Sequence, residues 1–268
     1  MLWNTQRCRV TVDGREAECI LFGTGSRKLV LLPGLGDSLR DGDTPALPMA
    51  FLYRRLAGHF RVAVICRARP QPRGATTRDM AADLAKILRR IGFDKADVVG
   101  VSMGGMVAQH LAADAPELVG KLVLVVTCGR PNAILTASLD DWCAMADRGD
   151  HRALMVDNLR RIYTPAYCRK NGWMIPLVAR LTRPRSYEQF LIDAEACRNH
   201  DAWEQILQIQ APTLILGGEK DLCLGGDASR ELAARIPGAQ LKMYPDQGHG
   251  LYEEAPDFQQ TILDFLLK

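Results

Sequence analysis

Short apolar runs alternate with helical patterns along most of this chain, and this alternation limits its possible folds more than any other feature. Five runs rich in β-branched residues stand at positions 28–33, 61–66, 97–101, 121–126 and 212–218. Such runs are typical of strands buried on both faces of a sheet. Between them lie patterns such as residues 78–93, where apolar residues recur at helical spacing. The sequence therefore predicts an α/β fold, a mostly parallel sheet flanked by helices.

Two regions depart from this alternation. Near the N-terminus, the runs CRVTVDG and EAECILFG are separated by an Asp-Gly turn, which predicts an antiparallel hairpin at the edge of the sheet. From about residue 127 the sequence has helical patterns and no convincing strand, and the sheet pattern resumes near residue 211. We therefore expect a core domain of residues 1–128 and 211–268, with a helical cap inserted at residues 129–210.

Two helix starts are predicted inside this insertion. Thr164 before Pro165 fits an N-cap followed by proline at the first helical position. Ser186 and Gln189 have the spacing of a capping box, in which each side chain bonds to the other residue's backbone N–H.

The charge balance gives no indication of a polyanionic partner. The net charge is only +3, which is too small to imply nucleic-acid binding. The basic stretch CRARPQPRG at residues 66–74 has no aromatic residues that could stack on bases. We interpret this stretch as a solvated loop, with a site for an anionic substrate group as the alternative.

The cysteine pattern indicates a reducing compartment. Eight cysteines are spaced widely and include no CxxC pair, and a chain of 268 residues does not need disulfides to fold. We expect buried free thiols and neither a metal site nor a cofactor. No signal peptide or membrane span is visible in the sequence, so we expect a cytoplasmic protein with no membrane partner.

One serine lies where a predicted strand meets a predicted helix. Residues 97–112 read DVVGVSMGGMVAQHLA, with Ser102 between the strand that ends near Val101 and the helix that begins near Met103. A Gly-x-Ser-x-Gly pattern alone would occur by chance in roughly one chain in ten of this length. In this setting, however, a sharp strand-to-helix turn would expose the hydroxyl at a helix N-terminus, where negative charge is favoured. Ser102 is therefore the predicted nucleophile.

A serine nucleophile needs a base and an orienting carboxylate, and both occur later in the chain. His249 lies between two glycines in a loop after the last predicted strand, AQLKMYP at residues 239–245, whereas the other four histidines lie in or beside predicted helices and strands. Asp221 follows a late strand in the sequence LILGGEKDLCLGG. The alternatives to Asp221 are a neighbour in the same loop and three carboxylates on the histidine's own loop: Glu219, Asp246, Glu253 and Glu254.

The negative charge that develops during attack on a carbonyl needs two backbone donors. Met103 N–H, directly after the serine, is one candidate. The other is Leu35 N–H in the segment PGLGDS, where Gly34 and Gly36 let the chain turn after an early strand.

Together these motifs resemble the α/β-hydrolase superfamily, in particular its small capped serine esterases and lactonase-like members. GVSMGG, LLPGLGDS, GGEKD and DQGHG stand in the order typical of that family. The resemblance implies a triad of Ser102, Asp221 and His249, an acyl-enzyme intermediate and a cap that shapes the substrate pocket. Two features depart from the family pattern. Pro33 stands where relatives usually have histidine, and CRARPQPRGATT keeps only the Arg-Gly of the usual Asp-x-Arg-Gly-x-Gly.

The predicted function is a serine hydrolase that acts on a small-molecule acyl substrate, namely a carboxylic ester, lactone or thioester. One alternative is a non-catalytic small-molecule binding or signalling protein on the same fold. Others are carbon–carbon bond hydrolysis, aminopeptidase activity and cofactor-free peroxidation, which use the same constellation of residues. A serine at position 102 argues against the dehalogenase branch, in which the nucleophile is aspartate.

Overall fold

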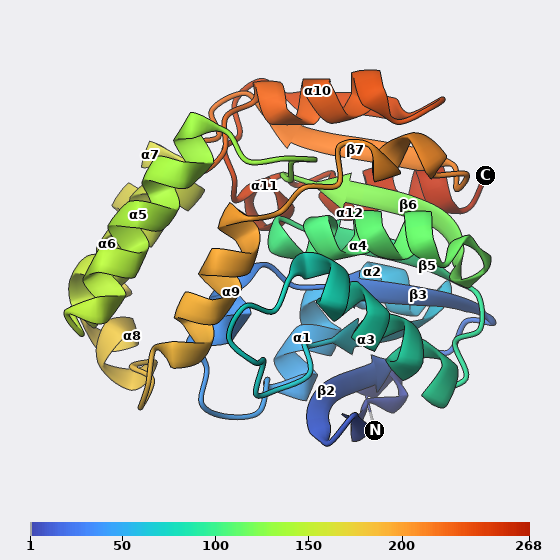
Figure 1. The fold of residues 1–268 in the computed structure, drawn as a ribbon, viewed down its shortest axis with the longest axis horizontal. Helices are drawn as coiled ribbons and strands as arrows, with labels where there is room; N and C mark the ends of the chain where they lie inside the picture. Colours follow the sequence, from blue (N-terminus) through green and yellow to red (C-terminus); the bar gives the residue numbers. More distant parts are fainter. Residues whose placement is uncertain (1) are drawn as a thin grey trace.

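The computed structural model describes residues 2–268, and an eight-stranded sheet lies at its centre (Figure 1). The strands are β1 (Gln6–Val12), β2 (Arg15–Phe22), β3 (Arg27–Leu32), β4 (Phe60–Ile65), β5 (Ala96–Val101), β6 (Val119–Val125), β7 (Thr213–Gly218) and β8 (Gln240–Tyr244). They lie in the order β1-β2-β4-β3-β5-β6-β7-β8, and the pairs from β4 to β8 are all parallel. The predicted α/β class with a mostly parallel sheet is confirmed.

The antiparallel part of the sheet begins with the hairpin of β1 and β2. Asp13 and Gly14 both have positive φ, 49° and 78°, as a tight hairpin turn requires. β2 then pairs antiparallel with β4, so β1 forms one edge of the sheet. The predicted hairpin and its edge position are confirmed.

Helices cover both faces of the sheet. One face packs against α1 (Ala46–Leu52), α2 (Arg54–Ala57), α11 (Leu251–Glu254) and α12 (Phe258–Leu266). The other face packs against α3 (Thr77–Arg90), α4 (Met103–Asp114) and α10 (Asp227–Arg235). Alternate residues of each central strand enter the two cores, as Leu31 and Leu32 of β3 do. This two-sided burial explains the continuous apolar runs.

Between β6 and β7 the described chain forms helices and turns but no strand. The helices are α5 (Ala133–Asp147), α6 (His151–Ile162), α7 (Pro165–Asn171), α8 (Ile175–Leu181) and α9 (Glu188–Arg198). Figure 1 shows α5 to α8 to the left of the sheet, with α9 between them and the rest of the molecule. The short 3-10 turns of the chain are η1 (Leu2–Asn4), η2 (Leu35–Leu39), η3 (Pro116–Leu118), η4 (Gly172–Met174) and η5 (Gln205–Gln208). α9 packs against α5 and η2, so it joins this helical segment to the loop after β3.

Of the two helix starts predicted in this segment, one is confirmed and one is wrong. Thr164 caps α7, because its side chain accepts a hydrogen bond from Tyr167 N–H. The predicted capping box does not form. α9 begins at Glu188, whose N–H donates to Ser186 Oγ. The side chain of Gln189 instead accepts from Gln71 N–H and donates to Asp193 of the same helix, so these two bonds replace the predicted one.

The cysteines follow the sequence-based expectation. All eight are free thiols, and five of them are buried: Cys19, Cys66, Cys128, Cys197 and Cys223. Among residues 2–268, none of the helices is both long and apolar enough to cross a membrane.

Candidate active site

Ser102 lies in a strained turn between β5 and α4. Its backbone has φ 52° and ψ −119°, a region that non-glycine residues occupy at a cost of about 1–3 kcal/mol. Ser102 N–H donates to Val125 O at 2.8 Å, and the Ser102 carbonyl accepts from Thr127 Oγ1 at 2.8 Å. These bonds fix the turn, which leaves the side chain half-buried at the N-terminus of α4.

The glycines on either side of Ser102 are required by close backbone approach. A Cβ on Gly104 would lie 2.3 Å from Leu32 O and 2.8 Å from Pro33 O. A Cβ on Gly100 would lie 2.5 Å from Gly104 O. The Gly-x-Ser-x-Gly pattern therefore lets β5 and α4 approach each other and lets the chain after β3 pass directly over the helix start.

Asp221 and His249 form a hydrogen-bonded pair. Asp221 follows β7, and His249 lies in the loop between β8 and α11. His249 Nδ1 is 2.8 Å from Asp221 Oδ2, while Asp221 Oδ1 accepts from Cys223 N–H at 2.8 Å and Leu224 N–H at 3.1 Å. A carboxylate can only accept, so the proton of the ring lies on Nδ1 and Nε2 is free to act as a base. The hydrogen bond to Asp221 therefore holds the His249 ring in the tautomer that is protonated on Nδ1.

The carboxylates that compete with Asp221 in the sequence all bond elsewhere. Their partners are Arg230 for Glu219, Lys220 for Asp246 (2.9 Å), Tyr163 for Glu253 (2.9 Å) and Thr164 for Glu254 (2.6 Å). Asp221 is thus the carboxylate that meets the His249 ring.

The loop after β3 lies against Ser102. A Cβ on Gly34 would be 3.4 Å from Ser102 Cβ and 3.9 Å from its Oγ. Leu35 begins η2 and Met103 begins α4, and within residues 2–268 neither N–H donates a hydrogen bond to another protein group. Pro33 lacks an N–H, but neither predicted donor depends on it.

Ser102 and His249 line one cavity of about 270 Å³. Apolar side chains from the sheet, α1 and α12 form much of its wall: Leu31, Val64, Val99, Met49, Phe258 and Ile262. Trp142, Ile162 and Phe190 close it from the helical segment between β6 and β7. In the described chain no hydrogen bond joins Ser102 Oγ to His249 Nε2, a contact that often tightens only when substrate binds.

Comparison with known proteins places the chain in a family. Residues 29–258 match the model of the alpha/beta hydrolase family. The chain belongs to this family. A 2-hydroxy-6-oxononadienedioate/2-hydroxy-6-oxononatrienedioate hydrolase of Paraburkholderia phymatum is 27% identical to this alpha/beta hydrolase over 263 residues, covering 91% of this chain and 88% of that protein. The predicted resemblance to the superfamily is confirmed. The prediction that the protein is a hydrolase is confirmed at the level of this family.

Solved structures agree with this alpha/beta hydrolase in fold. MGS-M2, an alpha/beta hydrolase enzyme from a Medee basin deep-sea metagenome library, superimposes with a TM-score of 0.87 at 19% identity, covering 97% of this chain and 98% of that one. The enol-lactonase from Burkholderia xenovorans gives 0.82 at 22% identity, covering 97% of this chain and 100% of that one.

One buried cluster in this alpha/beta hydrolase has side chains that bind metals in other proteins. Ligand atoms of Asp221, Cys223 and His249 lie within 4.8 Å of one another. However, Asp221 and His249 are hydrogen-bonded to each other, and burial raises the pKa of the Cys223 thiol well above its usual value. Metals bind the thiolate, so the cluster fits a hydrogen-bonded pair better than a metal site.

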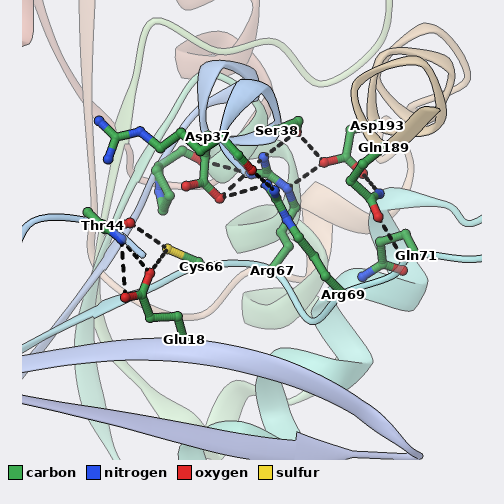
Figure 2. A network of polar contacts seen from close by, with 12 residues as sticks. Glu18, Asp37, Ser38, Thr44, Cys66, Arg67, Arg69, Gln71, Gln189 and Asp193 are labelled. Carbon is green, nitrogen blue, oxygen red and sulfur yellow. Dashed lines mark hydrogen bonds and ion pairs between the residues drawn. The ribbon is translucent and has the colours of Figure 1, made fainter. Parts of the chain in front are cut away.

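The basic stretch at residues 66–74 is only partly the solvated loop predicted from the sequence. Arg73 is exposed and pairs with Glu188 at 3.1 Å. Arg67, by contrast, has a side chain only 7% exposed and pairs through Nε with fully buried Asp193 of α9 at 2.9 Å (Figure 2). The solvated-loop interpretation is wrong for Arg67, because the fold supplies a carboxylate for it. Arg67 does not line the cavity, so it does not contact a ligand there.

Proposed function

We propose that this alpha/beta hydrolase is a serine hydrolase that cleaves a small carboxylic ester, lactone or thioester through an acyl-enzyme intermediate. The observation that carries the proposal is the meeting of Ser102 and His249 in one cavity, with Asp221 2.8 Å behind the ring. The three groups come from separate loops, which the fold brings to one end of the parallel strands.

The chemistry proceeds in two halves. Ser102 Oγ attacks the substrate carbonyl carbon while His249 Nε2 takes the hydroxyl proton, and Asp221 stabilises the imidazolium that forms. The tetrahedral intermediate collapses, the bond to the leaving group breaks, and His249 returns its proton to that group. Water then attacks the acyl-Ser102 carbonyl with His249 again as base, which releases the acid and regenerates the serine.

Two backbone donors stabilise the oxyanion of both tetrahedral intermediates. In this proposal they are the N–H groups of Leu35 and Met103, which flank Ser102 and have no protein acceptor within residues 2–268. The turn at Ser102 supports this role, because the Ser102 side chain makes no capping hydrogen bond to α4 and the N–H of the next residue stays free. Loss of one such donor typically costs about 3–4 kcal/mol of transition-state stabilisation.

The cavity favours a small, largely apolar acyl group. Its volume of about 270 Å³ is near the lower end for ligand pockets, which span about 300–1,000 Å³. Val99, Phe258 and Ile262 line it between the sheet and α12, where an acyl chain attached to Ser102 would avoid water. We assign the helices of residues 129–210 the role of a cap, since Trp142, Ile162 and Phe190 from this segment close the same cavity.

A substrate panel tests this function. Wild-type protein is assayed with nitrophenyl esters from acetyl to decanoyl, with small lactones including enol-lactones, and with a thioester. We expect turnover of at least one class, its loss in Ser102→Ala and His249→Ala, and wild-type turnover in Ser186→Ala, which changes an exposed serine outside the cavity. Equal turnover by wild type and His249→Ala would exclude the triad. A wild type that binds an ester without cleaving it would favour the non-catalytic binding protein.

A further inference from the structure

A single buried guanidinium holds the loop that follows β3. Arg67, just after β4, donates from Nη1 to Pro33 O at 3.2 Å and to Gly34 O at 3.3 Å. Its Nη2 donates to Gly34 O at 3.2 Å and to Ser38 Oγ at 2.9 Å. Figure 2 shows Arg67 at the centre of this network, between the loop and α9. Gly34 lies against Ser102, and Pro33 lies against Gly104 in the first turn of α4.

The bond to Gly34 O bears directly on Leu35. The carbonyl of Gly34 and the N–H of Leu35 belong to one planar peptide unit, so fixing the direction of the oxygen also fixes the direction of the N–H. Two guanidinium nitrogens share this oxygen, which restrains rotation of the peptide plane. A cationic donor on the carbonyl also polarises the peptide and strengthens its N–H as a donor.

The guanidinium is itself held from the helical segment between β6 and β7. Asp193 of α9 accepts from Arg67 Nε at 2.9 Å and from the hydroxyl of Ser38, and its second oxygen accepts from Gln189 Nε2 at 3.1 Å. Asp37 adds a second negative charge 3.8 Å from Nη2. Arg67 and Asp193 neutralise each other in a buried site, where either charge alone would be costly. α9 is thereby tied to the loop beside Ser102.

We propose that Arg67, anchored by Asp193, is a positioning residue for hydrolysis: it aligns the Gly34–Leu35 peptide so that Leu35 N–H points at the oxyanion. This inference rests on the proposed serine hydrolase function. Arg67 does not itself line the cavity, although it bonds to Pro33 and Gly34, which do, so it acts through the peptide and not on substrate. A substitution should therefore affect the transition state more than ground-state binding.

The test compares Arg67→Gln, Arg67→Lys and Arg73→Gln in the full chain. In Arg67→Gln we expect kcat to fall about 100-fold, as when one oxyanion donor is lost, with KM within about threefold of wild type. Affinity for a trifluoromethyl ketone, which mimics the tetrahedral intermediate, should fall by the same factor as kcat/KM. Arg67→Lys keeps the charge and should recover part of kcat. Arg73→Gln is the matched control, since Arg73 lies in the same basic stretch but is exposed, pairs with Glu188 at 3.1 Å and touches neither Pro33 nor Gly34.

Thermal unfolding shows whether Arg67→Gln folds. If it does not, Asp193→Asn and Arg67→Lys are used to test the positioning role. Asp193→Asn keeps the shape of the side chain, and we expect kcat to fall about tenfold through misplacement of Arg67, again with KM little changed. Folded variants that keep wild-type kcat and wild-type ketone affinity would overturn the positioning role. A wild type that neither cleaves esters nor binds the ketone would instead remove the proposed function, and the positioning role with it.

Discussion

The carboxylate of Asp221 and the imidazole of His249 meet at 2.8 Å between Oδ2 and Nδ1, and both side chains are buried. An amide at position 221 could donate to Nδ1 and so place the ring proton on Nε2, which would then be unable to accept the serine proton. We therefore expect Asp221→Asn to lower kcat about 10⁴-fold in the ester assay while the protein stays folded.

Asp246→Asn is the matched control for that substitution. Asp246 lies three residues before His249 but pairs with Lys220 at 2.9 Å on the surface. The kcat of Asp246→Asn should equal that of wild type. A large loss of kcat in Asp246→Asn with little loss in Asp221→Asn would contradict the assignment of Asp221 as the orienting carboxylate.

Gly104→Ala should damage both stability and activity. The new Cβ would lie 2.3 Å from Leu32 O, and backbone cannot yield as a flexible side chain does. We expect a loss of about 1–3 kcal/mol or more in the free energy of unfolding, measured by urea denaturation. Gly36→Ala serves for comparison, because a Cβ there meets nothing within 4 Å and should leave the unfolding midpoint near that of wild type.

Val99→Phe should shorten the acyl chain that the enzyme accepts. Val99 and Ile262 both line the cavity, so a phenyl ring at position 99 would occupy space that the proposal assigns to the acyl chain. We expect kcat/KM for octanoyl esters to fall more than about tenfold, with acetyl esters within about twofold of wild type. An equal fall for both esters would place the acyl group elsewhere in the cavity.

His200 should make the fold less stable in acid. Burial and the neighbouring His110 ring, 5.2 Å away, lower the pKa of His200 to about 3. In the unfolded chain its pKa is about 6.5, so between these values the unfolded state binds more protons. Stability therefore falls as the pH drops from about 6.5 towards 3, by up to about 1.4 kcal/mol per pH unit for this group.

Urea unfolding at pH 7.5, 6 and 5 measures this dependence. His200→Gln removes the titrating group and should flatten the fall in stability on acidification. The glutamine can still hydrogen-bond to Thr77, whose Oγ1 lies 2.8 Å from His200 Nδ1. Parallel curves for wild type and His200→Gln would contradict the assignment.

Two members of the candidate triad, Ser102 and His249, could be predicted from sequence because each has a local signature. Ser102 is marked by glycines whose Cβ atoms would collide with neighbouring backbone. His249 is marked by glycines as well: a Cβ on Gly250 would lie 2.7 Å from the ring of Tyr163. The strands β3 to β7 could be predicted equally well, because burial on both faces imposes continuous apolar runs.

The Arg67–Asp193 pair has no such signature. The two residues are 126 positions apart, and an arginine in a basic, proline-rich stretch is usually solvated. Only the packing of α9 against η2 brings the carboxylate to the guanidinium.

Which aromatic residues in the segment 129–210 line the cavity is equally hard to predict from the sequence. Trp142 is 6% exposed and lines the cavity, whereas Trp173 is 77% exposed, and spacing alone does not separate them.

Labelling with a fluorophosphonate, read by peptide mass spectrometry, tests most directly whether Ser102 carries the acyl group. We expect one adduct per chain, on the peptide that contains Ser102, in wild type and in Ser186→Ala but not in Ser102→Ala. A preparation that hydrolyses esters yet takes no label, or takes it on another residue, would contradict the proposed mechanism.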